Sequence, residues 1–340
     1  EIKKTRLETE LPVVNALLDM YAKCGCMEEA HKLFDQMETR DEASWTSMIS
    51  GHVNQRTNEE AWELFNQMPK KDVLSWTAMI QGYVQHGHHE SALEFFSQMQ
   101  IEGICPNHIT FGTVIGACAG LLDVELGQEI HAEIVWEGFQ SDLNISNALI
   151  DMYSRCGSLA DARSVFNGIL KRDAVTWNVM IGCCADHGNG NDVFELSQQM
   201  EEDGLKPDEF TISSILSACR HAGLVCEACY YLFHALRSYH IMPSVHHYAS
   251  MVDLLGRVGC LHKAAYFLNR IPFQPNLVVL MSFLSACKSH ADVDLAERFA
   301  DEMLNVGSEN MAAHVLLYNI FAGKNKLSDE DDILQLQQLV

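Results

Sequence analysis

The amino-acid sequence predicts an all-α protein, an α-solenoid in which stacked helix-turn-helix repeats form a right-handed superhelix. Three observations lead to this fold class. A unit of between 31 and 36 residues recurs along the chain. Within each unit, apolar residues recur with the spacing of one helix face and do not alternate as in a strand. A unit of this length cannot bury its own apolar face, so its stability must come from stacking on its neighbours.

Two consecutive segments, 143–173 and 174–208, show the repeating unit most clearly. Each has Asn at its fifth place, Gly at its fifteenth place and Asp at its last place. We expect residues 1–10 to be the tail of a truncated repeat. After them, the same pattern divides the chain into eight repeats: 11–41, 42–72, 73–107, 108–142, 143–173, 174–208, 209–244 and 245–276.

Each repeat carries signals for two helices and a turn. A glycine at the fifteenth place is expected to end the first helix in the left-handed conformation, which glycine adopts without steric penalty. Arg56 and Leu122 occupy this place in the second and fourth repeats and are the exceptions. At the twentieth place, small residues such as Ala30 and Ala61 allow the second helix to approach its neighbours closely.

Composition limits the function classes. The chain of 340 residues has 23 Lys and Arg against 46 Asp and Glu, a formal net charge of −23. This charge argues against loose, charge-driven adhesion to nucleic acid or to an anionic membrane. No apolar run approaches the roughly 18 residues of a transmembrane helix, so we expect no membrane partner. The 12 Cys are expected to be unpaired thiols. We expect the natural N-terminus, with any targeting peptide, to lie outside this chain.

Several segments resemble a known family. They are NALLDMYAKCG at 15–25, SWTAMIQGY at 75–83 and HYASMVDLLGRVG at 247–259. Tetratricopeptide repeats share the two-helix unit but keep a steady length of about 34 residues. The segments, with their alternation of longer and shorter units, resemble the plant pentatricopeptide repeat family, specifically its PLS subgroup. Residues 277–340 resemble the two E-type extension motifs of that subgroup, of which the last is expected to be divergent or truncated.

The resemblance implies that each repeat selects one RNA base through its fifth-place and last-place residues. The pairs that fit the family's code are Asn15 with Asp41, Thr46 with Asp72, Thr77 with Asn107, Asn147 with Asp173 and Asn178 with Asp208. The pairs outside the usual code are Gly112 with Asp142, Ser213 with Ser244 and Ala249 with Asn276. In the family, apolar second-place side chains sandwich the bases, and phosphate contacts fall at the thirteenth place, here Lys23, Arg155 and Arg257.

Hydrogen-bonding capacity gives a reason for part of this code. An Asp can only accept hydrogen bonds whereas an Asn can also donate, so the two should separate guanine from adenine. Thr46 with Asp72 then favours G, and Thr77 with Asn107 favours A. The family's code assigns Asn with Asp to U, although hydrogen-bonding capacity alone leaves U and C open. The expected target is U-G-A-x-U-U-x-x, where x marks a repeat outside the code.

Helix capping is the alternative explanation of the last-place residues. Asp or Asn before a helix is a good N-cap, and Asn or Thr in the first turn can support the cap locally. Capping alone explains the Asp series well. It explains the recurrence of Asn or Thr at the fifth place less well, because a helix interior disfavours both residues.

One pair of motifs imitates an enzyme site. His131 and Glu133, together with Cys226 and Cys229, match the two halves of a zinc deaminase signature. The halves lie in the fourth and seventh repeats, too far apart in a solenoid for their side chains to converge on one ion. We therefore expect no catalytic residue, no metal, no cofactor and no small-molecule substrate.

The function that the resemblance implies is non-catalytic, sequence-specific binding of single-stranded RNA, as a site-recognition factor for C-to-U editing. The expected partners are organellar RNA, a deaminase-bearing protein that supplies the chemistry and organellar editing factors. The expected location is a mitochondrion or a chloroplast, with the mitochondrion favoured. A protein-binding helical-repeat scaffold and a factor for RNA stabilisation or splicing stay as alternatives.

Overall fold

The computed structural model describes residues 11–271, 275–306 and 311–322. Within these residues every regular element is an α-helix, which confirms the predicted all-α class. The predicted repeat tail at 1–10 and the chain after residue 322 lie outside the described residues. The chain divides into two compact units, residues 1–172 and residues 173–340.

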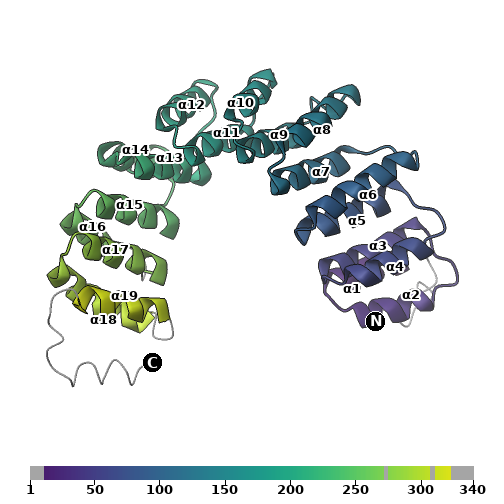
Figure 1. Cartoon of the computed structure of the whole chain (residues 1–340), viewed down its shortest axis with the longest axis horizontal. Helices are drawn as coiled ribbons and strands as arrows, with labels where there is room; N and C mark the ends of the chain where they lie inside the picture. Colours follow the sequence, from purple (N-terminus) through teal and green to yellow (C-terminus); the bar gives the residue numbers. More distant parts are fainter. Residues whose placement is uncertain (1–10, 272–274, 307–310, 323–340) are drawn as a thin grey trace. The chain divides into compact units, whose positions relative to one another are not determined.

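The first unit is a succession of helix pairs (Figure 1). Its helices are α1 (Leu11–Lys23), α2 (Met27–Asp35), α3 (Glu42–Asn54), α4 (Asn58–Gln67), α5 (Val73–Gln85), α6 (His89–Ile101), α7 (His108–Leu121), α8 (Val124–Trp136), α9 (Leu143–Arg155) and α10 (Leu159–Gly168). Each odd-numbered helix packs against the next odd-numbered helix, from α1 to α9. Each even-numbered helix from α2 to α8 packs against the odd-numbered helices before and after it, and α10 packs against α9.

The second unit repeats this arrangement. Its helices are α11 (Ala174–Asp186), α12 (Gly190–Glu202), α13 (Glu209–Ala222), α14 (Val225–Ser238), α15 (Val245–Arg257), α16 (Leu261–Leu268), α17 (Leu277–Ser289), α18 (Val293–Val306) and α19 (Met311–Ala322). The odd-numbered helices again pack one against the next, with the even-numbered helices between successive members. No described helix is both long and apolar enough to cross a lipid bilayer.

Equivalent places in the repeats form the core. The eighth place of each odd-numbered helix from α1 to α17 holds a fully buried aliphatic side chain: Leu18, Ile49, Ile80, Ile115, Ile150, Ile181, Leu216, Val252 and Leu284. Ala30, Ala61 and their counterparts at the twentieth place are likewise buried, and their small side chains permit close helix packing. The stacked helix pairs predicted from the sequence are therefore confirmed.

The turn between the two helices has the same backbone conformation in repeats with and without glycine. Gly25 and Gly87 have φ angles of 79° and 78°, as expected for a left-handed helix end. Arg56 and Leu122, the two exceptions in the sequence, have φ angles of 63° and 58°. A residue with a Cβ pays a steric penalty of about 1–2 kcal/mol in this region, so the packing of the repeats imposes the turn on both residues.

Candidate nucleic-acid interface

The last residue of each repeat is the N-cap of the next first helix. The side chain of Asp41 accepts a hydrogen bond from the Ser44 amide at 2.9 Å, and Asp72 accepts one from the Ser75 amide at 2.9 Å. The side chains of Asn107, Asp142, Asp173, Asp208 and Asn276 accept equivalent bonds from the first turns of their helices. The capping interpretation is therefore correct for these residues. It does not use every polar atom that they carry.

In two repeats the structure places the fifth-place and last-place side chains in direct contact. In the first repeat, Asn15 Nδ2 lies 3.0 Å from both carboxylate oxygens of Asp41. In the sixth repeat, Asn178 Nδ2 donates to Asp208 Oδ2 at 2.8 Å. Each pair joins residues 26 or 30 positions apart in the chain. Local capping within one helix does not require such a contact.

A buried hydroxyl at the third place of the following repeat completes the arrangement, and sequence reasoning missed it. Ser44 Oγ donates to Asn15 Oδ1 at 2.7 Å, and Thr211 Oγ1 donates to Asn178 Oδ1 at 2.6 Å. Each hydroxyl also contacts the capping Asp. The third-place hydroxyl residues Ser44, Ser75, Thr110, Thr176 and Thr211 are all fully buried. A signal was present in the sequence, because an Asp or Asn is followed three residues later by Ser or Thr in each case.

Hydrogen bonds keep the Asp41 carboxylate ionised. Burial alone would raise the pKa of Asp41, but hydrogen bonds from Ser44 and Asn15 outweigh it and leave the pKa below its ordinary value. The carboxylate is therefore an acceptor at neutral pH. Its neighbour Asn15 is held with its amide oxygen on the buried hydroxyl and its amide nitrogen on the carboxylate.

Two other fifth-place residues, Thr77 and Thr46, are arranged differently. Thr77 is buried, and its hydroxyl bonds to the Val73 carbonyl at 2.6 Å and to Thr110 Oγ1 at 2.7 Å. Thr110 in turn bonds to Asn107 at 3.1 Å, so this pair is linked through the third-place hydroxyl. Thr46 is more accessible, and its hydroxyl donates to the Glu42 carbonyl at 2.8 Å.

Three further pairs lie outside this pattern. Ser213 Oγ lies 2.9 Å from His247 Nε2, and His247 occupies the third place of the eighth repeat. Gly112 and Ala249 have no polar side-chain atom to offer a base. Asn147 and Asp173 belong to different compact units, and their pairing stays a prediction.

Apolar side chains at the second place are exposed, next to the capping residues. Leu74, Ile109, Val175 and Phe210 are 52%, 48%, 57% and 73% exposed, and Val278 is 68% exposed. Pro12 and Ala43 at the same place are exposed as well. Isolated exposed apolar residues are ordinary, but recurrence at one repeat position is typical of a surface that contacts flat apolar ligands. Base faces are such ligands.

The three predicted phosphate-contacting cations share a further feature that was not expected. Each forms an ion pair with an Asp four residues earlier: Lys23 with Asp19 at 2.7 Å, Arg155 with Asp151 at 2.8 Å and Arg257 with Asp253 at 2.8 Å. Exposed pairs of this kind are weak, and all three cationic side chains stay more than half exposed. They can therefore approach a phosphate, although with part of their charge neutralised.

The motifs that imitate a deaminase have ordinary surroundings. His131 Nδ1 lies 2.9 Å from the Tyr153 hydroxyl, and burial lowers the pKa of His131. Cys226 and Cys229 lie on α14, in the other compact unit. In the part of the chain that the structure describes, no three His, Cys, Asp or Glu side chains are grouped so that they could hold a metal ion.

Comparison with known proteins identifies the family. The model of the PPR repeat family matches residues 71–120 and 172–221. The model of the single PPR repeat matches residues 13–41, 43–73 and 145–173. Together the two models match more than half of the chain. The chain belongs to the pentatricopeptide repeat family. The five pairs that fit the family's code all lie within the matched residues.

Plant pentatricopeptide repeat proteins are similar over nearly the whole chain. Pentatricopeptide repeat-containing protein At2g13600 of Arabidopsis thaliana is 42% identical over 96% of this chain and 48% of its own length. The mitochondrial protein At2g03880 is 33% identical over 98% of this chain and 48% of its own length. The chloroplastic protein At1g08070 is 30% identical over 94% of this chain and 39% of its own length. The chain thus spans about half or less of the length of these Arabidopsis relatives.

Solved pentatricopeptide repeat structures share the fold. The maize protein PPR10 superposes with a TM-score of 0.62 at 19% sequence identity, over 96% of this chain and 52% of that protein's chain. PPR10 in complex with an 18-nt psaJ RNA element superposes with a TM-score of 0.58 at 16% identity, over 96% of this chain and 58% of that chain. These likenesses show that the chain shares the stacked-helix-pair fold of PPR10.

Proposed function

We propose that this pentatricopeptide repeat protein binds single-stranded RNA, one base per repeat, and selects the site of C-to-U editing in an organellar transcript. A partner protein supplies the deaminase. The observation that carries the proposal is the contact of fifth-place Asn with last-place Asp, held by a buried hydroxyl and flanked by exposed apolar second-place side chains. Support for RNA as the ligand comes from the related fold of PPR10, which was solved with bound RNA.

The geometry of the sixth repeat supplies a physical reason for uracil. Asn178 uses its Oδ1 to accept from Thr211 and one Nδ2 hydrogen to bond Asp208. Its second Nδ2 hydrogen and the free lone pairs of the Asp208 carboxylate then remain for a base. Uracil presents a carbonyl acceptor beside its N3–H donor and complements this pair. Cytosine presents an amine beside an unprotonated N3, which would place donor against donor and acceptor against acceptor.

The second-place side chains supply affinity without base selectivity. Every base has an apolar face, and stacking of that face on an aromatic side chain contributes about 1–3 kcal/mol per base. Val175 in the sixth repeat and Phe210 in the seventh offer exposed apolar side chains to base faces in the second unit. Polar groups at the fifth and last places then select among bases that are already held.

The editing assignment rests on the resemblance of residues 277–340 to E-type extension motifs of the PLS subgroup. An organellar location is supported by relatives that are named mitochondrial or chloroplastic. A role in RNA stabilisation or splicing would use the same RNA contacts. Loss of editing at one cytidine, with transcript level and splicing unchanged, distinguishes the editing role in a plant that lacks this protein.

The experiment that tests base selection is enrichment of binders from a random single-stranded RNA pool, with the wild-type chain and with Thr46→Asn. An Asn at position 46 can use Asp72 and the buried Ser75 as Asn15 uses Asp41 and Ser44. We expect the preference at the second base to change from G toward U while the other bases stay unchanged. Enrichment of no base at any position would favour a protein-binding scaffold.

A further inference from the structure

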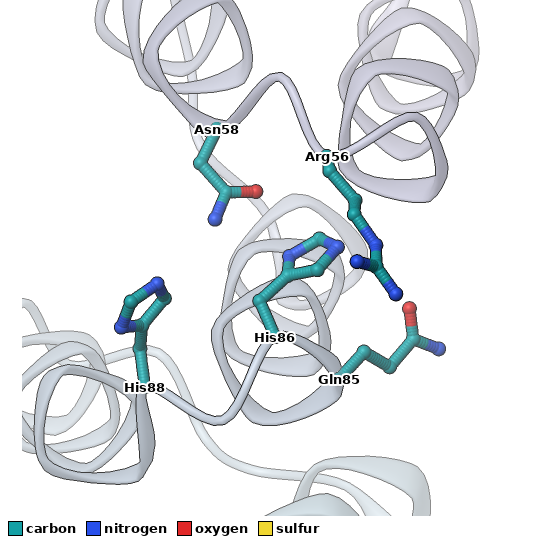
Figure 2. Close-up of a pocket in the computed structure, with 5 residues that line it drawn as sticks. All are labelled: Arg56, Asn58, Gln85, His86 and His88. Carbon is teal, nitrogen blue, oxygen red and sulfur yellow. The ribbon is translucent and has the colours of Figure 1, made fainter. Parts of the chain in front are cut away.

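A polar pocket lies where the inter-helix turns of the second and third repeats meet, within the first unit. It has a volume of about 310 Å³ and is lined by Arg56, Asn58, Gln85, His86 and His88 (Figure 2). Arg56 lies in the turn between α3 and α4, and Asn58 is the first residue of α4. Gln85 is the last residue of α5, and His86 and His88 lie in the turn between α5 and α6. No role for these residues follows from base selection at the fifth and last places.

The pocket lining carries a cation and no carboxylate, in an acidic chain. Its lining contains one Arg and two His and no carboxylate, although the chain as a whole has a net charge of −23. Arg56 is exposed and makes no ion pair in the described part of the chain. It thus differs from Lys23, Arg155 and Arg257, which are all paired with Asp.

Hydrogen-bonding groups at the pocket lack partners. His86 Nδ1 and Asn58 Oδ1 are buried atoms without a hydrogen-bond partner. A ring nitrogen of His86 can carry a proton, and a half-turn of the Asn58 amide would present its two N–H donors at the same point. Buried polar atoms of this kind are unfavourable unless a ligand or water satisfies them.

Two helices also begin at the pocket. Helix α4 starts at Asn58 and α6 starts at His89, directly after the lining residue His88. Neither helix has a side-chain N-cap hydrogen bond. Their first turns also carry the carboxylates of Glu59, Glu60 and Glu90, which offset part of the positive dipole ends, so it is the first-turn N–H groups that favour an anion here.

The pocket lies at the C-terminal end of the row of first helices, where the thirteenth-place residues are found. In the second and third repeats that place holds Asn54 and Gln85, neither of which is charged. Gln85 is itself part of the pocket lining, and Arg56 lies two residues after Asn54. A cationic pocket thus stands where these two repeats lack a cation at the expected phosphate-contacting place.

We propose that Arg56, His86 and His88 form a binding site for a phosphate group of the RNA backbone, between the second and third repeats. The proposal rests on the proposed RNA-binding function and adds a phosphate contact to it. The guanidinium offers two N–H donors to the phosphate oxygens, as is usual for Arg, and the imidazoles and the first-turn amides add further donors. The contact holds the backbone between the second and third bases and does not select either base.

Arg56→Gly is the sharpest perturbation, because the chain itself places glycine at this turn in other repeats. The φ angle of Arg56 is 63°, which glycine adopts freely, so the variant removes the charge and relieves the backbone at once. Leu122→Gly is the matched control, since Leu122 has a φ angle of 58° at the equivalent turn and carries no charge. Arg56→Lys tests whether charge alone restores the contact.

The first measurement is a titration with inorganic phosphate, followed through the imidazole NMR signals of His86 and His88. We expect saturable shifts in the wild-type chain and in Leu122→Gly, and loss of saturation in Arg56→Gly. Identical shifts in Arg56→Gly and the wild type would overturn the site. This measurement uses no RNA, so it stands even if the chain proves not to bind RNA and the proposed function fails.

The second measurement is the salt dependence of binding to an oligonucleotide with the predicted U-G-A-x-U-U-x-x order and to a scrambled one. For Arg56→Gly we expect affinity to fall about threefold or more for both RNAs, and the salt slope to fall by about 0.7, the value for one phosphate of a single strand. Leu122→Gly should leave the affinity and the salt slope unchanged, and Arg56→Lys should restore part of the affinity and part of the salt slope. Saturable phosphate binding with an unchanged RNA salt slope in Arg56→Gly would overturn the assignment to the RNA backbone.

Discussion

Replacement of Thr211 by Val tests whether the buried third-place hydroxyl orients the base-contacting amide. Thr211 is fully buried in α13. Its Oγ1 lies 2.6 Å from Asn178 Oδ1 and 3.1 Å from Asp208 Oδ1, and it accepts a hydrogen bond from the Asp208 amide at 3.1 Å. Valine has nearly the same shape and offers none of these contacts.

The magnitude follows from what the substitution leaves behind. Asn178 Oδ1 and the Asp208 amide lose their partner, and an unsatisfied buried group costs about 1–3 kcal/mol. Both residues are partly accessible, so water can replace part of the loss, and we expect a decrease of about 1–2 kcal/mol in the free energy of unfolding. The Asn178 amide also becomes free to rotate by a half-turn, which exchanges donor for acceptor at the base. The preference for U over C at the sixth base should then fall roughly 3- to 10-fold, the equivalent of one hydrogen bond of about 1 kcal/mol.

Two assays on the same variant separate stability from selectivity. Urea denaturation gives the change in the free energy of unfolding. Competition between RNAs that differ only by U or C at the sixth base gives the preference. Ser197→Ala is the matched control, because Ser197 is a buried hydroxyl of the sixth repeat, to which Asn178 belongs, and it donates to the Val193 carbonyl at 2.6 Å within α12. It should lower stability and leave the U-to-C ratio unchanged. If Thr211→Val weakened all RNAs equally and kept the ratio, the hydroxyl would not orient the amide.

Two further predictions concern charge. Burial lowers the pKa of His52 below 6.5, and the neighbouring His31 lowers it further. The Nε2 atoms of the two rings lie 2.7 Å apart. The neutral form of His52 is therefore favoured in the fold. The stability that neutral His52 contributes is complete above pH 6.5 and is lost as the pH falls through the lowered pKa. The free energy of unfolding, measured with urea, should therefore be smaller at pH 5.5 than at pH 7.5. His52→Gln should reduce this difference. Asp253 accepts from Arg257 at 2.8 Å and lies 3.6 Å from Arg220, so its carboxylate neutralises part of the charge of both cations. Asp253→Asn removes this carboxylate charge. The variant should therefore bind RNA more tightly, with a salt slope steeper by about 0.7. An unchanged slope would mean that these cations do not face the RNA.

The sequence was sufficient for the fold because the core is the same in every repeat. The buried aliphatic residue at the eighth place and the small residue at the twentieth are both visible as a recurring pattern. The turn at the fifteenth place was less visible where Arg56 and Leu122 replace glycine. Both residues adopt the left-handed conformation, so neighbouring helices determine this turn more strongly than local preference does.

The candidate site could be predicted only in part, because a fifth-place residue and its environment come from different repeats. Asn15 and Thr77 occupy the same place, yet Asn15 is half-buried and meets Asp41, whereas Thr77 is buried and meets Thr110. A single repeat pattern cannot distinguish these two cases. The ion pair between Lys23 and its neighbour four residues earlier was accessible from the sequence, since side chains at that spacing meet on a helix.

Helix capping and base selection, which the sequence presents as alternatives, are compatible in the structure. The cap fixes Asp208 by its bonds to the first turn of α13, and this fixed carboxylate holds Asn178 through Oδ2. A donor and an acceptor that are already held by the protein lose little conformational freedom when a base arrives, which favours selectivity from few contacts. The same reasoning explains why an acidic chain can bind RNA under our proposal. Selection would depend on a few fixed polar groups and apolar faces, and the cations would be needed only at scattered points along the backbone.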